Sequence, residues 1–237
     1  MRSELYRAAL AAMVAGVAGT GLGGLWAFMP GSRSNGAARA MLLFASGLMT
    51  AVVCFELIPE ALALSGLGPL IAGIVSGVAA VALLSALIPG EDAAARTGWL
   101  VAASIALHNL PEGLAIGAGY AAFPALGIRL ALVIALHDLP EGLAAAAPLR
   151  TAGVAPWRVF LLCALTGVPT GVGGLLGAII GRISARWVAV SMGFAGGAML
   201  YVTCGEMLPL TQRMGAERWQ ALWQIAGFAA GLLASSL

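Results

Sequence analysis

Residues 106–115 read ALHNLPEGLA, and residues 135–144 read ALHDLPEGLA, so the two decapeptides differ at a single position. Each lies in the middle of an apolar segment, the first over about 98–122 and the second over about 125–149. A short turn separates the two segments, so if both cross lipid they must run antiparallel. The repeat therefore predicts two copies of one polar motif on neighbouring helices.

The composition shows that most of the chain has lipid as its solvent. Of 237 residues, 61% are hydrophobic and 9% are charged, whereas a soluble domain carries about 25% charged residues. This excludes a soluble enzyme, a nucleic-acid-binding protein and a disordered linker. The cysteines, Cys54, Cys163 and Cys204, lie singly in apolar runs and give no disulfide or zinc-knuckle signal. We predict an all-α polytopic membrane protein.

Loop signals divide the chain into eight apolar segments, each about long enough to span a bilayer. The segments cover about 8–29, 39–64, 68–88, 98–122, 125–149, 157–181, 187–210 and 218–237. The first follows Arg2 and Arg7 as a signal peptide would, but it exceeds the roughly 7–15 residues of a secretory apolar region, so we interpret it as a retained span. We expect one transmembrane domain over 1–237.

A second repeat has an offset of 150 residues. For example, Cys54 and Glu56 recur as Cys204 and Glu206. The first three segments therefore resemble the last three, in opposite direction, which predicts a 3+2+3 arrangement with inverted repeats. Many transporters place a site at the bilayer midplane in this way.

The distribution of arginines favours an orientation with both termini outside. With this orientation the inside loops hold Arg33, Arg39, Arg96, Arg150, Arg158, Arg213 and Arg218. The outside segments hold Arg2, Arg7, Arg129, Arg182 and Arg186. The excess on the inside predicts that both termini lie outside, which would be the periplasmic side of an inner membrane.

The histidines of the chain each begin one copy of the polar motif. His108 and Glu112 are four residues apart, as are His137 and Glu141, so each pair lies on one helix face. Imidazole nitrogens and carboxylate oxygens suit Zn²⁺, and also Fe²⁺, Mn²⁺ or Co²⁺. Two facing antiparallel helices would bring the four side chains together as a metal site.

Asn109 and Asp138 each follow a histidine by one position. We expect them to point towards a neighbouring subsite or the wall of the ion pathway. The alternative is that all these polar groups only make helix contacts. An acid at the centre of a membrane helix costs about 2.5–3.5 kcal/mol, so a repeated acidic motif favours a functional role.

Prolines and glycines complete the motif. Pro111 and Pro140 lack the backbone N–H, which predicts a bent helix and a free carbonyl close to each histidine. A free carbonyl at membrane depth is tolerated where it lines a wet cavity or is buried in protein. Gly113 and Gly142 allow a neighbouring helix to approach closely.

Five further residues are candidates for the ion pathway. Glu56, Glu60 and Glu206 lie near a proline at a helix end, where an entrance ligand and a solvated interfacial acid are both open interpretations. Met49 and Met199 lie deeper. A methionine in an apolar helix is more often a core residue than a ligand, although its thioether binds soft metals.

With these residues, the whole chain resembles the ZIP (Zrt/Irt-like protein) family of metal transporters, of the bacterial GufA-like or ZupT-like kind. The most specific parts are HNLPEG at 108–113 and HDLPEG at 137–142. The resemblance implies eight helices in a 3+2+3 arrangement, both termini outside, and movement of Zn²⁺, Fe²⁺ and related ions towards the cytoplasm. It implies a transport site formed by His108, Glu112, His137 and Glu141.

The resemblance also implies a second subsite, with Asn109 and Asp138, that shares the two glutamates. Bacterial relatives often supply an acid from the sixth helix, but Thr170 stands there in this chain. A single-metal site is therefore the expectation. The loop over 89–97 contains no histidine, so no metal-buffering loop is implied.

We hypothesise import of a divalent transition metal, Zn²⁺ first and then Fe²⁺, Mn²⁺, Co²⁺ and Cd²⁺, with protons as competitors at the site. The metal is cargo, and no prosthetic group is expected. The expected partners are the metal ion and the lipid bilayer, with no nucleic acid and a homodimer left open. One alternative is an intramembrane metal-dependent hydrolase, but H-E-x-x-H is absent from the sequence. A metal sensor or scaffold is another.

Overall fold

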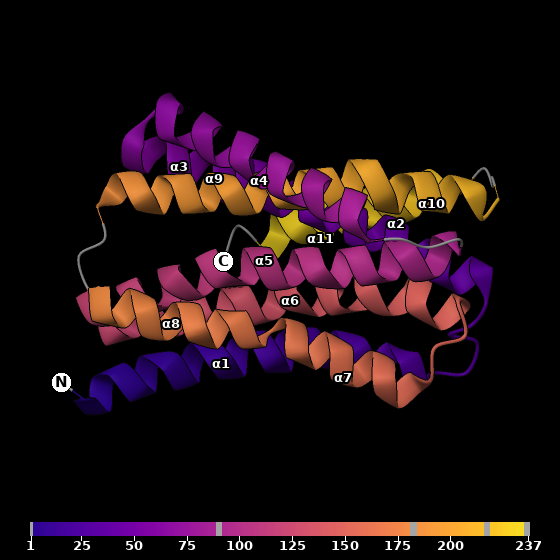
Figure 1. Ribbon diagram of the computed structural model, residues 1–237, viewed down its shortest axis with the longest axis horizontal. Helices are drawn as coiled ribbons and strands as arrows, with labels where there is room; N and C mark the ends of the chain where they lie inside the picture. The colour runs from indigo at the N-terminus through magenta and orange to yellow at the C-terminus, as the bar shows by residue number, and fades with distance from the viewer. Residues whose placement is uncertain (1, 89–91, 181–183, 216–218, 235–237) are drawn as a thin grey trace.

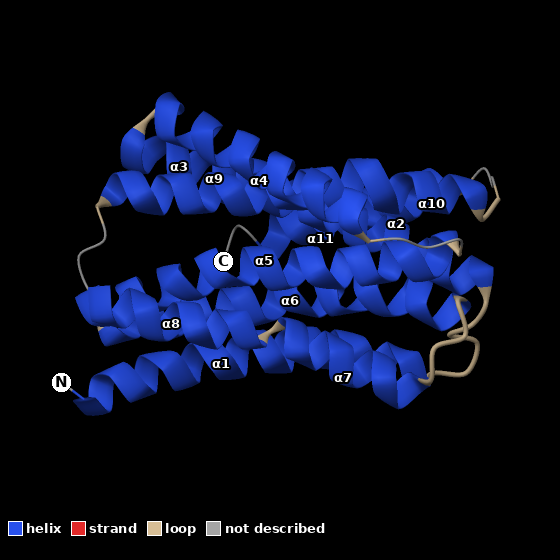
Figure 2. Cartoon of the chain, in the orientation of Figure 1, coloured by secondary structure: helices blue, strands red, loops and turns tan. Residues whose placement is uncertain are grey.

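The computed structural model describes residues 2–88, 92–180, 184–215 and 219–234. Within these ranges the chain is helical and contains no strand (Figure 2). The predicted ends of segments at 181, 218 and 235–237, the loop residues 89–91, and Arg182 and Arg218 lie outside the described residues.

The helices follow the eight predicted segments. In chain order they are α1 Arg2–Gly24, the 3₁₀-helix η1 Leu25–Phe28, α2 Asn35–Val52, the π-helix η2 Val53–Leu57, α3 Ile58–Ser65, α4 Leu67–Leu87, α5 Ala93–Ala122, α6 Pro124–Thr151, α7 Pro156–Thr166, α8 Val168–Ile180, α9 Ala185–Val202, the π-helix η3 Thr203–Met207, α10 Leu208–Arg213 and α11 Gln220–Ala234.

Seven of the described segments are long and apolar enough to cross a membrane, and the last, Gln220–Leu233, is apolar but shorter. This confirms the prediction of an all-helical, multi-pass membrane protein. The reason is the composition of each segment: apolar side chains face outwards along most of the helices, so lipid is the solvent that fits them.

The helices form two layers (Figure 1). One layer holds α1, α5, α6, α7 and α8, and the other holds α2, α3, α4, α9, α10 and α11. In the first layer α1 packs on α6 and α8 packs on α5, and in the second α2 packs on α11 and α9 packs on α4. These paired contacts agree with the two-fold relation of the repeats. Their 3+2+3 arrangement stays a prediction.

Glycines bring the motif helices into close contact with their neighbours. A Cβ at Gly113 would lie 2.0 Å from the carbonyl oxygen of Thr170 on α8, and a Cβ at Gly142 would lie 2.0 Å from that of Thr20 on α1. No larger residue fits either position without movement of a backbone. The predicted close approach at both glycines is confirmed.

The sixth predicted segment, 157–181, corresponds to one apolar span over Pro156–Ile179, but the helix within that span is interrupted. The chain forms α7 and α8 instead, with a break at Gly167 (Figure 1). Pro169 has no N–H to donate to the carbonyl four residues earlier, which interrupts the hydrogen-bond ladder at this point. By contrast, α5 and α6 continue through Pro111 and Pro140.

The second and seventh spans each contain one π-helical turn, η2 and η3. The sequence analysis did not predict these turns, which occupy equivalent positions in the repeat. Pro59 and Pro209 follow them and lack the N–H that an α-helical ladder would need there. Isolated π-turns inside α-helices occur often at functional sites, and each turn here carries one glutamate, Glu56 or Glu206.

Candidate metal site

The two decapeptides lie against each other on α5 and α6 (Figure 1), and their histidine–glutamate pairs cross between the helices. Nε2 of His108 lies 2.9 Å from Oε2 of Glu141, and Nε2 of His137 lies 3.4 Å from Oε1 of Glu112. The structure therefore brings together the histidine and glutamate side chains that the sequence repeat predicted as metal ligands. Each histidine faces the glutamate of the other copy.

The cluster is deeply buried. His108, Glu112, His137 and Glu141 are at most 5% exposed, and Asn109 and Asp138 are fully buried. Within the described residues, nearly all buried side-chain oxygens and nitrogens without a hydrogen-bond partner belong to these six residues. Buried polar groups are usually paired, so a concentration of unpaired acceptors at one place fits a site that takes up a cation.

The ligand atoms form two overlapping groups. Atoms of His108, Glu112 and Glu141 lie within 4.8 Å of one another, and so do atoms of Glu112, His137 and Asp138. Glu112 belongs to both groups. The Glu112 carboxylate therefore lies between two adjacent positions that an ion could occupy, and it can contribute an oxygen to each.

Asn109 and Thr170 lie beside the cluster with different roles. The Nδ2 of Asn109 donates to the carbonyl oxygen of Thr166 at 2.8 Å, which ties α5 to α7, while its Oδ1 has no partner. The Thr170 hydroxyl is buried and has no partner either. This hydroxyl lies against α1, where a Cβ at Gly16 would be 2.4 Å from it, so position 170 carries a neutral hydroxyl instead of a carboxylate.

A cavity of about 290 Å³ reaches Glu112 and His137 from one end of the molecule. Glu56 and Glu60 also line this cavity, with Glu56 half-buried and Glu60 exposed. Its wall includes Leu64 near the end of α3 and Val188 near the start of α9, so it opens at the end where α1 begins (Figure 1).

The two candidate methionines lie elsewhere. Met49 and Met199 are each 1% exposed and belong to the main core cluster. The hydroxyl of Thr203 donates to the Met49 sulfur at 3.9 Å. Neither methionine lines the cavity, so the structure places both as core residues.

Glu206 is largely buried, and it lines a cavity of about 340 Å³ together with Arg96, Thr97 and Arg213. Its side chain is 11% exposed and lies 3.0 Å from Nη1 of Arg96, and Ser85 also contacts it. Sequence reasoning missed Arg96 and Ser85 as its partners, because neither is close to Glu206 in the sequence. It also missed Ser104, a buried, unpartnered hydroxyl that lies one helical turn before His108, a spacing that would have indicated it.

Comparison with known proteins identifies the family of the chain. Residues 89–237 match the family described as ZIP Zinc transporter. The chain is 37% identical over 235 residues to Zinc transporter ZIPB of Bordetella bronchiseptica, covering 91% of this chain and 76% of that protein. It is 34% identical over 151 residues to Zinc transporter GufA of Myxococcus xanthus, covering 62% of this chain and 59% of that protein.

The fold, the site and these matches define the class: this is a membrane transporter of divalent metal ions and not an enzyme. The chain belongs to the ZIP family, as the two decapeptides indicated. The intramembrane hydrolase is not favoured.

Proposed function

We propose that the protein carries Zn²⁺, and also Fe²⁺, Mn²⁺, Co²⁺ and Cd²⁺, across the inner membrane towards the cytoplasm. One observation carries the proposal: the two histidine–glutamate pairs from antiparallel helices meet in a buried cluster. The names of the two relatives, both zinc transporters, favour zinc as the first substrate.

The geometry of the cluster fits a zinc-sized ion. Tetrahedral ligands at Zn–N and Zn–O distances of about 2.0–2.1 Å lie about 3.3 Å from one another. The His137–Glu112 distance is 3.4 Å and the His108–Glu141 distance is 2.9 Å. Each pair therefore has a spacing that one ion can bridge. Because the two groups of ligand atoms overlap only at Glu112, all four side chains surround one ion only if the two groups draw together around it.

One ion at a time occupies the cluster in this proposal. Asp138 offers an alternative ligand beside His137, and Glu112 contributes to both positions. A second ion would bring a second double charge into a buried site where Thr170 supplies no carboxylate. The ion therefore moves between the two positions, with Glu112 as the shared ligand.

The ion enters through the cavity that contains Glu56 and Glu60. The distribution of arginines favours periplasmic termini, and with that orientation this cavity opens to the periplasm. Carboxylates in a cavity attract cations and raise their local concentration. The protein needs no prosthetic group for this activity, since the metal is the cargo.

Metal flux into proteoliposomes tests the proposal. We expect the His108→Ala and Glu141→Ala variants to lose zinc uptake, while Ser46→Ala retains it. Ser46 is a matched control because it is buried and polar but bonds only to the backbone of its own helix. Undiminished uptake in both site variants would refute the site.

A further inference from the structure

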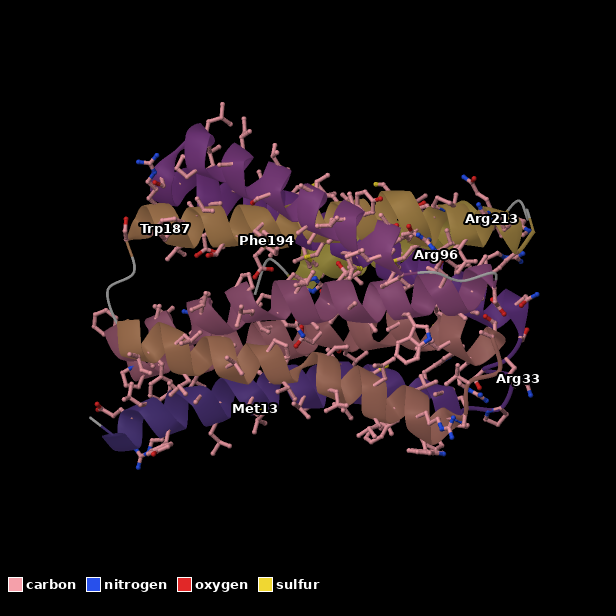
Figure 3. The ribbon with its side chains drawn as sticks, viewed as in Figure 1. Met13, Arg33, Arg96, Trp187, Phe194 and Arg213 are labelled. Carbon is pink, nitrogen blue, oxygen red and sulfur yellow. The ribbon has the colours of Figure 1, made fainter. Side chains whose placement is uncertain are left out.

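A cluster of three polar residues lies towards the end of the molecule opposite the cavity at Glu56, and two of the three line a separate cavity of about 340 Å³. The cluster consists of Arg96 on α5, Ser85 on α4 and Glu206 on η3, and we call it the Arg96 cluster. Figure 3 shows Arg96 and Arg213 towards one end of the molecule and Trp187 at the other. Trp187 lies next to Val188, which lines the wall of the cavity.

The contacts within the Arg96 cluster form a closed ring. Nη1 of Arg96 donates to Oε2 of Glu206 at 3.0 Å, and Nη2 donates to both the carbonyl and the hydroxyl oxygen of Ser85 at 2.8 Å. The Ser85 hydroxyl donates to Oε1 of Glu206 at 3.0 Å. Both oxygens of Glu206 are therefore occupied by groups of this chain.

The ring joins the two layers of helices. Arg96 comes from the layer that carries the metal site, and its partners come from the other layer. It lies twelve residues before His108, which is roughly 18 Å along the helix. Between the two, Leu100, Val101 and Ile105 are buried in the main core cluster. The metal site is therefore sealed on this side, first by apolar packing and then by the ion pair.

The repeat shows that the two ends differ. Glu206 corresponds to Glu56 by the offset of 150 residues, and both lie on π-turns. The two decapeptides are offset by 29 residues, so the position equivalent to Arg96 is Ala125. Glu56 lines a cavity that also reaches Glu112 and His137. Glu206 lines a second cavity, of about 340 Å³, together with Arg96 and Arg213, and no residue of the metal site lines that cavity. The Glu206 carboxylate is paired with the Arg96 guanidinium. Both pseudo-symmetric acids therefore line a cavity, but only the cavity at Glu56 continues to the metal site, and only Glu206 is paired with an arginine.

We propose that Arg96 is a tethered cation that competes with the transported metal for Glu206. While Arg96 holds Glu206, this end stays closed and the cavity with Glu56 stays open. A divalent ion that reaches Glu206 replaces the guanidinium as the counter-charge, and the two layers separate here. Arg96 is thus a positioning residue for ion release. The inference rests on the proposed function, because it assumes that the ion passes Glu206.

Thiol labelling of the open cavity tests this role. Ala118 lines the cavity, and an Ala118→Cys variant in a background without the native cysteines reports access from the side of the termini. We expect a membrane-impermeant maleimide to label this protein rapidly. Adding Arg96→Gln should slow labelling roughly threefold to tenfold and raise the half-saturating zinc concentration for uptake by a similar factor, because the open state is less populated.

Two matched variants separate this role from general destabilisation. Arg96→Lys keeps the positive charge and should retain most of the labelling rate. Glu206→Gln should slow labelling as much as Arg96→Gln does, and the double variant should be no slower than either, because both remove one interaction.

The inference is overturned if the Ala118→Cys protein is labelled at the same rate with and without the Arg96→Gln or Glu206→Gln substitution. It is also overturned if Arg96→Lys slows labelling as much as Arg96→Gln does. Failure of the proposed function looks different. In that case the protein with an intact Arg96 cluster fails to take up zinc, although its labelling still depends on Arg96.

Discussion

His108 lies 2.9 Å from Glu141 on the neighbouring helix, although Glu112 stands one turn away on its own helix. The other copy has the same arrangement, with His137 facing Glu112. Each histidine–carboxylate pair therefore takes its histidine from one decapeptide and its glutamate from the other. An ion bound among these groups joins α5 to α6, and neither decapeptide forms the site by itself.

Glu112 should matter more for zinc affinity than any other carboxylate in the cluster. It is the residue shared by both groups of ligand atoms. We expect Glu112→Gln to weaken zinc binding by more than the about 10–100-fold typical of losing an outer-shell partner. Competition with a chromogenic chelator measures this affinity. Glu60→Gln is the control, since Glu60 is exposed in the cavity and should change affinity by less; equal losses would contradict a bridging role.

Close packing at Gly142 should be essential for stability. A Cβ there would lie 2.0 Å from the Thr20 carbonyl, whereas a Cβ at Gly68 would meet nothing within 4 Å. We expect Gly142→Ala to lower the free energy of unfolding by about 1–3 kcal/mol, the usual range for overpacking. Gly68→Ala should leave it unchanged or raise it. Thermal unfolding in detergent compares them, and equal melting temperatures would contradict the close packing.

Zinc binding should weaken in acid. The site binds metal through neutral imidazoles and ionised carboxylates, so protons and metal compete for the same atoms. Lowering the pH from about 7.5 to about 5.5 crosses the range in which imidazoles ordinarily gain a proton. Affinity and uptake should therefore fall as pH falls, and an affinity that rises or stays constant over this range would exclude His108 and His137 as ligands.

The neutral hydroxyl of Thr170 should limit the cluster to one ion. In Thr170→Asp a carboxylate replaces an unpartnered hydroxyl in the same buried place. We expect the stoichiometry of bound zinc, measured by mass spectrometry of the intact protein, to increase from one ion to two. Thr170→Val should still bind one. Two ions in the unmodified protein would show that the carboxylate is not required.

The sequence predicted the spans and the meeting of the two decapeptides because both depend on local patterns. Apolar length defines a span, and four-residue spacing puts His108 and Glu112 on one face. Gly113 and Gly142 indicated close helix contacts for a similar reason. In each case the physical cause lies within a few consecutive residues.

Features that depend on distant contacts were not predictable. Arg96 and Glu206 are far apart in the sequence, so only packing of the two layers shows that they pair. Near a proline, a helix can keep its α-helical hydrogen bonds, form a π-turn or break, and these patterns differ little in energy. The composition of a span therefore does not predict the break at Gly167 or the two π-turns. For the same reason Glu206 was left open as a solvated acid or an entrance ligand.

X-ray absorption spectroscopy of the zinc-loaded protein tests the central claim most directly, because it reports the atoms bound to the ion. Coordination by His108, Glu112, His137 and Glu141 predicts nitrogen and oxygen ligands at about 2.0–2.1 Å, with imidazole scattering that disappears in the His108→Ala, His137→Ala double variant. A sulfur shell at about 2.3 Å, or an unchanged imidazole signal in the double variant, would contradict the site.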